Sequence, residues 1–239
     1  MIIRSPLATP ARFLKRLLRF NGSDKKHWAY PESQLAHSLL HGLSGLEIGP
    51  STHNPFGLNT RNVGRTDPIY EAEQLRITGT FSKIDIEADA DAIPVPDDSE
   101  DFVLSSHVIE HCPDFIKTVL EWYRIIKPNG YLFMIAPLRD AAPSDRNRPL
   151  TTWSHLVTDF VNQTTPEMEP EAGVFGHCHY HVFTIDTMKD FLKTIFSERL
   201  ELVTAQNRDD KIGNGFTLVY RKTPTFQTQP WVAKYQPNA

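Results

Sequence analysis

The chain has 239 residues, of which 40% are hydrophobic and 23% are charged, and its formal net charge is −4 at pH 7. This length suits a single α/β domain with a buried sheet, and the acidic balance excludes a general positive field that would attract nucleic acid. The two cysteines, Cys112 and Cys178, are too few for a disulfide framework, so a reducing, cytoplasmic location is expected. No apolar run approaches the roughly 18 residues that span a bilayer, so no transmembrane segment is expected.

Two helices are predicted before the first strand. Residues 10–20 place apolar side chains on one helical face and basic side chains on the other. A helix that caps the sheet is favoured there over one that binds a membrane surface or a partner. A second helix is predicted over residues 31–42, because Pro31 suits a helix start and Gly42 a helix end.

From residue 43 onward, short apolar segments alternate with helical or loop segments. Strands are predicted at residues 43–49, 62–66, 83–86, 101–105, 131–136, 200–204 and 216–220, and helices at 115–126 and 186–196. The Lys-Pro-Asn-Gly sequence at residues 127–130 should stop the first of these helices and form a turn. This alternation predicts parallel strands with right-handed crossovers, and the last two strands should form a hairpin.

Three parts are expected along the chain: an N-terminal helical segment at 1–42, a domain at 43–221 and a C-terminal tail at 222–239. Within the domain, residues 138–181 are rich in Arg, Pro, Asp and His and interrupt the alternation after the fifth strand. An insert at this point should lie over the carboxyl ends of the strands, where open α/β sheets bind their ligands.

The first strand ends in the sequence Glu47-Ile48-Gly49-Pro50-Ser51. A glycine at such a turn lets the backbone approach a ligand without a Cβ atom in the way. Asp67 follows about 20 residues later, the distance at which an acidic side chain meets ribose hydroxyls in nucleoside-binding α/β folds. The alternative for Asp67 is a turn aspartate before Pro68.

Three further motifs follow along the chain: Asp89-Ala-Asp-Ala-Ile-Pro-Val-Pro-Asp97, Val108-Ile-Glu-His111 and residues 120–130. Together, residues 43–137 resemble class I S-adenosylmethionine-dependent methyltransferases of the type 11 kind. The usual second and third glycines of the first motif are missing, and Ser51 and His53 stand roughly in their place.

This resemblance implies a Rossmann-like, doubly wound, mostly parallel seven-stranded sheet with an antiparallel last strand. It also implies S-adenosylmethionine as the cofactor. In the family, the acid of the Asp89 segment and the following amide read the adenine edge, so Asp89 and Ala90 are candidates for that contact. The full cofactor-binding set expected is Glu47, Gly49, Pro50, Ser51, Asp67, Asp89, Ala90, Ser106 and His107.

Methyl transfer from a sulfonium is an in-line displacement, so alignment and exclusion of water are most of what a protein supplies. A hydroxyl acceptor also needs a base, and histidine suits that role. His107 leaves the fourth strand where this fold faces the transferring methyl; a core or helix-capping histidine is the alternative. The catalytic candidates are His107, His181 and His155.

Histidines also gather in the insert. His177, His179 and His181 alternate along the chain, so neighbours would lie about 6.5 Å apart on one face of an extended segment. His155 and Asp159 are spaced i, i+4 on an expected helix and share a face. We expect all five to converge near the cofactor methyl and to offer either a general base or a divalent metal site. A polar lid that contacts the substrate is the alternative.

Three arginines, Arg139, Arg146 and Arg148, precede that helix. Guanidinium groups on such a loop suit a carboxylate or phosphate of the substrate. The equally weighted alternative is surface salt bridging with Asp140 and Asp145.

The expected function is methyl transfer to oxygen or nitrogen of a small polar or anionic acceptor, such as a sugar or natural product. The expected partner is this small-molecule acceptor, without nucleic acid, and homo-oligomerisation is left open. Two alternatives are a catalytically silent cofactor-binding protein that works through a partner, and a metal-dependent enzyme on the same fold.

Overall fold

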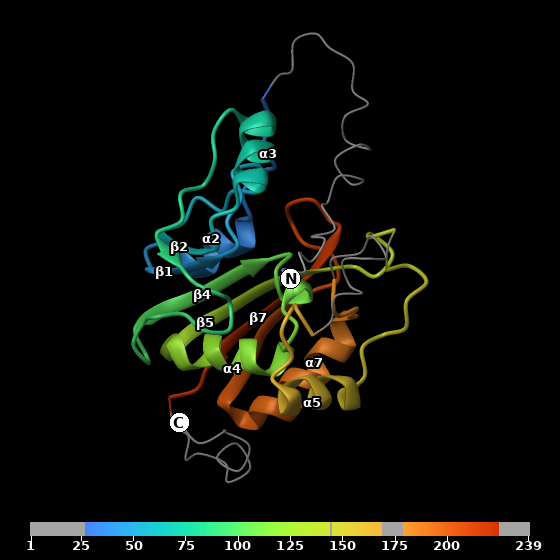
Figure 1. The fold of residues 1–239 in the computed structure, drawn as a ribbon. Helices are drawn as coiled ribbons and strands as arrows, with labels where there is room; N and C mark the ends of the chain where they lie inside the picture. The colour runs from blue at the N-terminus through green and yellow to red at the C-terminus, as the bar shows by residue number, and fades with distance from the viewer. Residues whose placement is uncertain (1–26, 144, 169–178, 225–239) are drawn as a thin grey trace, which may run out of the picture.

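The computed structural model describes residues 27–143, 145–168 and 179–224, and their fold centres on one mixed sheet (Figure 1). The seven strands are β1 (Gly45–Ile48), β2 (Thr60–Gly64), β3 (Ile86–Glu87), β4 (Glu100–Ser106), β5 (Ile126–Pro137), β6 (Leu200–Gln206) and β7 (Gly215–Lys222). Their order is β3-β2-β1-β4-β5-β7-β6. The pairings among β1 to β5 are parallel, whereas β7 is antiparallel to both β5 and β6. The predicted fold class is therefore confirmed.

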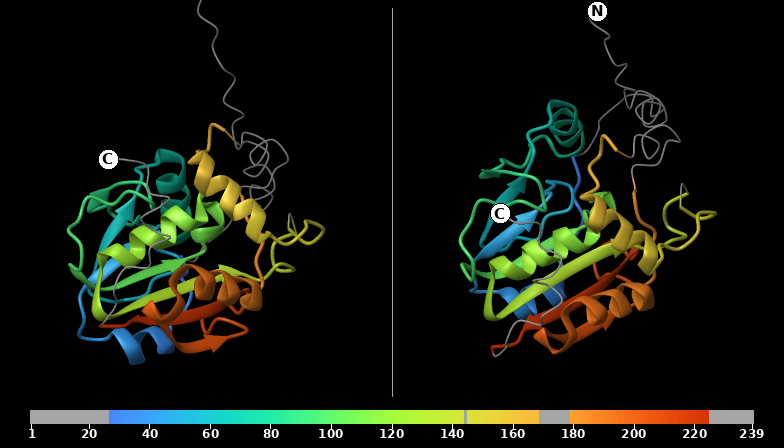
Figure 2. Two further views of the ribbon diagram at one scale, coloured as in Figure 1. Left: turned by 90° about the horizontal axis from the view of Figure 1, so that it is seen from below. Right: turned by 60° about the horizontal axis from the view of Figure 1, so that its bottom comes forward.

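Helices cover both faces of this sheet (Figure 2). They are α2 (Gln34–Leu40), α3 (Pro68–Thr78), α4 (Phe115–Ile125), α5 (Trp153–Asn162) and α7 (Ile185–Phe196), with short 3-10 turns η1 (Ile109–His111) and η2 (Ser197–Arg199). Two apolar clusters fill the space between the helices and the sheet. The larger one joins α4 and α7 to one face of the sheet, and the smaller one joins α2 to the other face. None of the helices in the described ranges has the length and apolar character needed to cross a bilayer.

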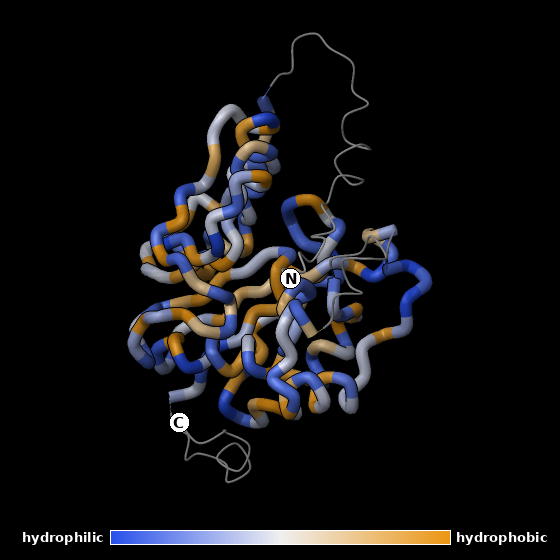
Figure 3. Tube along the Cα trace, in the orientation of Figure 1, coloured by the Kyte–Doolittle hydropathy of each residue, from blue (hydrophilic) through white to orange (hydrophobic). Residues whose placement is uncertain are grey.

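The alternation of buried side chains between the two faces of the sheet explains this layering. In β4, Val103 belongs to the larger cluster, while its neighbours Phe102 and Leu104 belong to the smaller one. Successive side chains of a strand point to opposite faces, so a strand that is apolar throughout is covered on both sides. Figure 3 shows the same contrast: the central strands are largely apolar, whereas the long loop after β5 is largely hydrophilic.

Several predicted boundaries differ from those observed. The second strand ends at Gly64 rather than at residue 66, and the third is only Ile86–Glu87 rather than 83–86. The helix expected at 31–42 is α2, which is shorter because the Ser33 hydroxyl accepts the Ala36 N–H and caps its start. The helix expected at 10–20 and most of the tail expected at 222–239 lie outside the described residues.

The Lys-Pro-Asn-Gly segment is incorporated into a strand rather than preceding it. β5 begins at Ile126, directly after α4, and its pairing register with β4 shifts between Glu100 and Phe102. Asn129 has a φ of 69°, the left-handed conformation that a turn needs. A turn is therefore present, but the flanking residues still pair with β4.

Helix α3 was not predicted from the sequence. It begins after Asp67, has proline at its first turn and ends at Gly79, whose φ is 78°. Only Gln74 is buried among its residues, so it lacks the apolar stripe by which surface helices are recognised. The aspartate, proline and glycine at its ends were the available signal.

Candidate functional site

A cavity of about 270 Å³ opens at the carboxyl ends of β1 and β4. The strand order reverses between these two strands, and this reversal is where open α/β sheets bind ligands. β1 and the turn after it contribute Glu47, Gly49 and Ser51 to the lining, and the exit of β4 contributes Ser106 and His107. Five of the nine residues predicted to bind the cofactor therefore lie together at one cavity.

The rest of the lining comes partly from the same segment after β1 and partly from distant parts of the chain. It consists of Tyr30, Ile48, His53, Asn54, Phe56, Tyr70, Ile212 and Asn214. The loop between β6 and β7 is shaped by Asp209, whose carboxylate accepts backbone N–H groups of residues 211, 212, 213 and 215. This loop places Ile212 and Asn214 at the cavity. Sequence reasoning missed it, because no local motif marks a hairpin loop that returns to the first strand.

Gly49 holds the turns after β1 and β4 in close contact. Its φ is 66°, and a Cβ atom added to it would lie 2.7 Å from Cγ2 of Val108. Glycine is therefore required here both by the backbone conformation and by the lack of space. The close approach seen here is to Val108, and the predicted approach of this backbone to a ligand stays a prediction.

The Glu47 carboxyl faces the cavity from β1, and burial raises its pKa to about 7, against the opposing effects of the Lys211 charge and a hydrogen bond from Thr60. Lys211 reaches over from the β6–β7 loop, and its ammonium lies 4.0 Å from the Phe56 ring centroid. Burial lowers the pKa of Lys211 to about 8, although nearby carboxylates, Glu47 first, oppose this. Near neutral pH, Glu47 in the cavity lining and Lys211, which contacts the lining residue Phe56, can thus each change charge.

His107 lies in the left-handed region, with a φ of 56°. That conformation is uncommon for a residue other than glycine. Its side chain is 25% exposed, lines the cavity and places Nδ1 3.7 Å from the Glu110 carboxylate. Of the three catalytic candidates, His107 is the one at the cavity.

The other cofactor candidates, Pro50, Asp67, Asp89 and Ala90, are not among the described residues that line the cavity. Asp67 caps α3 by accepting the backbone N–H groups of residues 69 and 70. Asp89 forms a two-pronged ion pair with Arg65, at 2.8 and 2.6 Å, and this interaction lowers its pKa. The Ala90 carbonyl accepts the indole N–H of Trp122. A nucleoside that reached Asp89 would have to exchange with Arg65.

The three arginines of the insert have different surroundings. Arg148 is used within the fold, because its guanidinium donates to the Asp145 carboxylate and to the carbonyls of His179 and Tyr180. Arg139 donates to the Arg148 carbonyl at 2.6 Å. Arg146 is exposed and donates only weakly, at 3.3 Å, to a backbone carbonyl.

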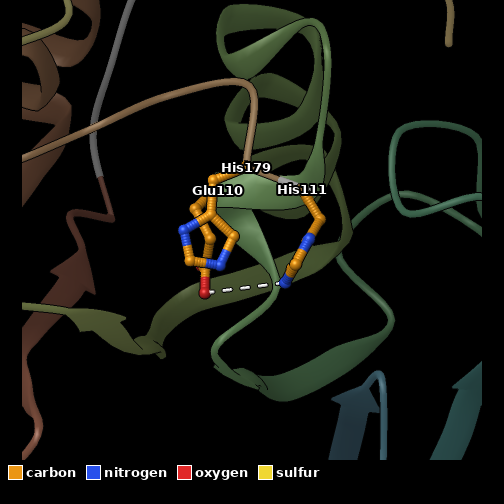
Figure 4. A group of neighbouring side chains, drawn as sticks. All are labelled: Glu110, His111 and His179. Atoms are coloured by element: carbon orange, nitrogen blue, oxygen red, sulfur yellow. Dashed lines mark ion pairs between the residues drawn. The ribbon is translucent and has the colours of Figure 1, made fainter. Parts of the chain in front are cut away.

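The metal candidates do not converge at one point, which corrects the prediction from the sequence. His155, Asp159 and His181 form one group, which we call the His181 cluster. His179 instead joins Glu110 and His111, which we call the Glu110 cluster (Figure 4). His177 lies outside the described residues.

The chain path separates the two alternating histidines. The backbone N–H groups of Tyr180 and His181 both donate to the Glu110 carbonyl, so the segment does not run on as a regular strand. His179 and His181 therefore reach different neighbours. Glu110 and His111 were missed as site residues, although the Glu-His pair directly after β4 was visible in the sequence.

His181 lies away from the cavity, 1% exposed, and its Nε2–H donates to the Pro113 carbonyl at 3.2 Å. Burial lowers its pKa to about 3, and the neighbouring His155 lowers it further. A group with so low a pKa is a weak proton acceptor near neutral pH. His155 is 40% exposed and lies 3.3 Å from the Asp159 carboxylate, on α5.

The central part of the chain is similar to known proteins. Residues 65–134 match the family described as "Methyltransferase domain". Over 112 residues the chain is 28% identical to a probable S-adenosylmethionine-dependent methyltransferase of Mycolicibacterium smegmatis, covering 44% of each protein. Over 92 residues it is 33% identical to demethylmenaquinone methyltransferase of Listeria welshimeri, covering 37% of this chain and 36% of that protein. The chain thus spans less than half the length of these relatives.

A similar fold occurs among solved structures. The crystal structure of a SAM-dependent methyltransferase from Thermotoga maritima matches with a TM-score of 0.50 and 19% sequence identity. The match covers 80% of this chain and 86% of that one. At this identity the likeness concerns the fold alone.

Proposed function

We propose that this protein transfers a methyl group from S-adenosylmethionine to a small acceptor, because residues 65–134 match the family described as "Methyltransferase domain" and the chain is similar to a probable S-adenosylmethionine-dependent methyltransferase. The acceptor atom is an oxygen or nitrogen of a polar or anionic molecule, such as a sugar or natural product. The observation that carries this proposal is the cavity at the β1/β4 strand-order reversal, built around Gly49 and His107.

The residues at this cavity fit the methyl donor. Gly49 lines the cavity, and Val108 fills the space that a Cβ atom at this position would need, so the turn has to be built with glycine. Glu47 and Ser106 add polar groups to the same wall, as expected for a site that fixes the orientation of a small molecule. When bound, S-adenosylmethionine supplies an electrophilic methyl group.

The chain's own residues supply positioning and proton transfer. We assign His107 as the base for a hydroxyl acceptor, because it is the catalytic candidate that lines the cavity. Arg146, on the exposed loop after β5, is the candidate for an anionic group of the acceptor, whereas Arg148 is committed to Asp145. Asp67 and Asp89 are kept as proposed contacts to the ribose and adenine of the donor.

Calorimetry with S-adenosylhomocysteine, which cannot react, tests the donor site. We expect the unaltered protein to bind it, and Asp89→Ala to weaken binding by about 1–3 kcal/mol, the cost of an unpaired polar partner. Arg65→Ala is the matched control: it removes the same ion pair but leaves Asp89 available, so binding should be retained. Absence of binding by the unaltered protein would overturn the proposal.

The acceptor is tested with isotope-labelled donor, an acceptor panel and mass spectrometry of the products. Arg146→Ala should raise KM for an anionic acceptor and leave donor affinity unchanged. An equal loss of both affinities would contradict the assignment of Arg146.

A further inference from the structure

Glu110 is a buried carboxylate that the fold itself does not satisfy. It is 1% exposed, and neither carboxylate oxygen has a hydrogen-bond partner among the described residues. Two imidazoles lie close to it, with His107 Nδ1 at 3.7 Å and His111 Nε2 at 3.8 Å, both beyond hydrogen-bond distance. Leaving a carboxylate buried in this way is costly, so such a group calls for a charged ligand or an explanation by function.

Two imidazoles stand beside this carboxylate. The rings of His111 and His179 lie edge to face, with centroids 4.7 Å apart. One donor atom from each of Glu110, His111 and His179 lies within 4.8 Å of the other two. Figure 4 shows the Glu110 oxygen facing the His111 ring, with the His179 ring next to them.

A further carboxylate orients one of these rings. The Nδ1–H of His179 donates to Asp145 Oδ2 at 2.5 Å, and Asp145 is held in turn by Arg148 at 2.9 Å. Histidine ligands of metals commonly donate one ring N–H to a carboxylate, which fixes the tautomer and directs the other nitrogen at the ion. Asp145 is 1% exposed, so this support is built into the fold.

We propose that Glu110, His111 and His179 bind a divalent first-row metal ion, with Asp145 supporting His179. Two imidazoles and one carboxylate suit zinc, iron or manganese and leave coordination positions open for other ligands. The site adjoins the cavity, because Glu110 lies 3.7 Å from His107, which lines it. The role of this ion rests on the proposed function. The ion would bind the hydroxyl oxygen of the acceptor and lower the pKa of that hydroxyl, and His107 would accept the hydroxyl proton.

The His181 cluster is the rival position, and its surroundings differ. His181 is enclosed by Phe115 and Phe183, with ring centroids 6.4 and 5.6 Å away. Asp159 already accepts from the Thr164 hydroxyl. Aromatic rings thus enclose the central histidine of this cluster, whereas the Glu110 cluster adjoins the cavity.

Metal binding can be measured without any turnover. Chelator-treated protein would be titrated with Co²⁺, followed by its visible absorption, and with Zn²⁺ by calorimetry. We expect one equivalent to bind. Glu110→Gln, His111→Ala and His179→Ala should each weaken binding by more than the roughly 10–100-fold that loss of a supporting residue causes. Asp145→Asn should weaken metal binding by an amount within that roughly 10–100-fold range.

His155→Ala and Asp159→Asn are the matched controls in the rival cluster, and both should bind Co²⁺ as the unaltered protein does. Loss of binding in Asp159→Asn with retention in Glu110→Gln would overturn the proposal, and so would the absence of stoichiometric binding by the unaltered protein.

Thermal unfolding separates loss of the site from loss of the fold. Glu110→Gln keeps the shape and removes a buried charge, so metal-free Glu110→Gln should melt no lower than the metal-free unaltered protein. Zn²⁺ should raise the melting temperature of the unaltered protein and leave that of Glu110→Gln unchanged. An equal rise in both would contradict the proposal. S-adenosylhomocysteine binding, measured separately, reports on the proposed function and can fail independently.

Discussion

The Glu110 cluster and the His181 cluster use the same kinds of side chain in different surroundings. Both combine histidines with a buried carboxylate, and both take a histidine from the end of the insert, His179 in one and His181 in the other. In the first, a second carboxylate and an arginine support the histidine, and His107 links the group to the cavity. In the second, burial among aromatic rings holds a neutral histidine. The contrast shows that the same residue types can form two different sites, because the residues around each cluster determine its exposure and its hydrogen bonding.

The largest effect expected is on stability when the support of the Glu110 cluster is removed. Asp145→Ala should lower the free energy of unfolding by about 3 kcal/mol, because it leaves Arg148 without its carboxylate partner and His179 without its acceptor. Denaturant unfolding measures this. Asp140→Ala, an exposed aspartate on the same loop, should change stability by less than about 0.5 kcal/mol. Similar losses in both variants would mean that Asp145 has no special role.

The next effect distinguishes the His181 cluster by its pH dependence. The pKa of His181 is about 3 in the folded protein and 6.5 as its ordinary value, so the unfolded chain binds the proton first. Its contribution to stability is complete above pH 6.5 and is lost as the pH falls toward 3. His181→Phe should remove this dependence. When the pH is lowered from 8 to 5, the free energy of unfolding of His181→Phe should therefore rise by about 2 kcal/mol relative to that of the unaltered protein.

Other groups act in the opposite direction over part of this range, so the difference between the two proteins is the quantity to measure. Burial raises the pKa of Glu47 to about 7 and that of Asp114 to about 6, and their stabilising contributions are lost as the pH rises. Parallel stability–pH curves for His181→Phe and the unaltered protein would show that His181 titrates normally.

A smaller effect is expected where the cavity meets the Glu110 side of the molecule. Gly49→Ala should cost about 1–2 kcal/mol, because it combines a left-handed backbone with a contact to Val108 at 2.7 Å. It should also weaken S-adenosylhomocysteine binding. Gly42→Ala is the control, since Gly42 has a φ of 83° but nothing within 4 Å of an added Cβ atom. An equal cost at both positions would mean that backbone strain alone accounts for the effect.

The smallest effect is expected for the exposed member of the His181 cluster. His155→Gln removes an imidazole that is 40% exposed, so we expect a change of less than about 0.5 kcal/mol and unchanged S-adenosylhomocysteine affinity. Calorimetry and denaturant unfolding test both expectations. A tenfold loss of donor affinity would connect this cluster to the cavity after all.

The local sequence determined much of the framework. Alternating apolar segments predicted a mostly parallel sheet closed by a hairpin, and Glu47, Gly49 and His107 were placed at the ends of the correct strands. These predictions succeed because strand periodicity and glycine turns depend on residues close together in the chain. Helix α3 escaped detection and the third strand was placed too early, at 83–86 instead of Ile86–Glu87, since neither element has a long apolar pattern.

Only the tertiary structure decided which histidine meets which carboxylate. His179 and His181 are two positions apart, yet the hydrogen bonds to the Glu110 carbonyl send them to different clusters. For Arg148 the structure decided between substrate binding and ion pairing, because its guanidinium also donates to the carbonyls of His179 and Tyr180. Contacts of this kind join residues more than 30 positions apart, for example His179 to Asp145. They form only when packed helices and strands bring those segments together, so no local pattern in the sequence encodes them.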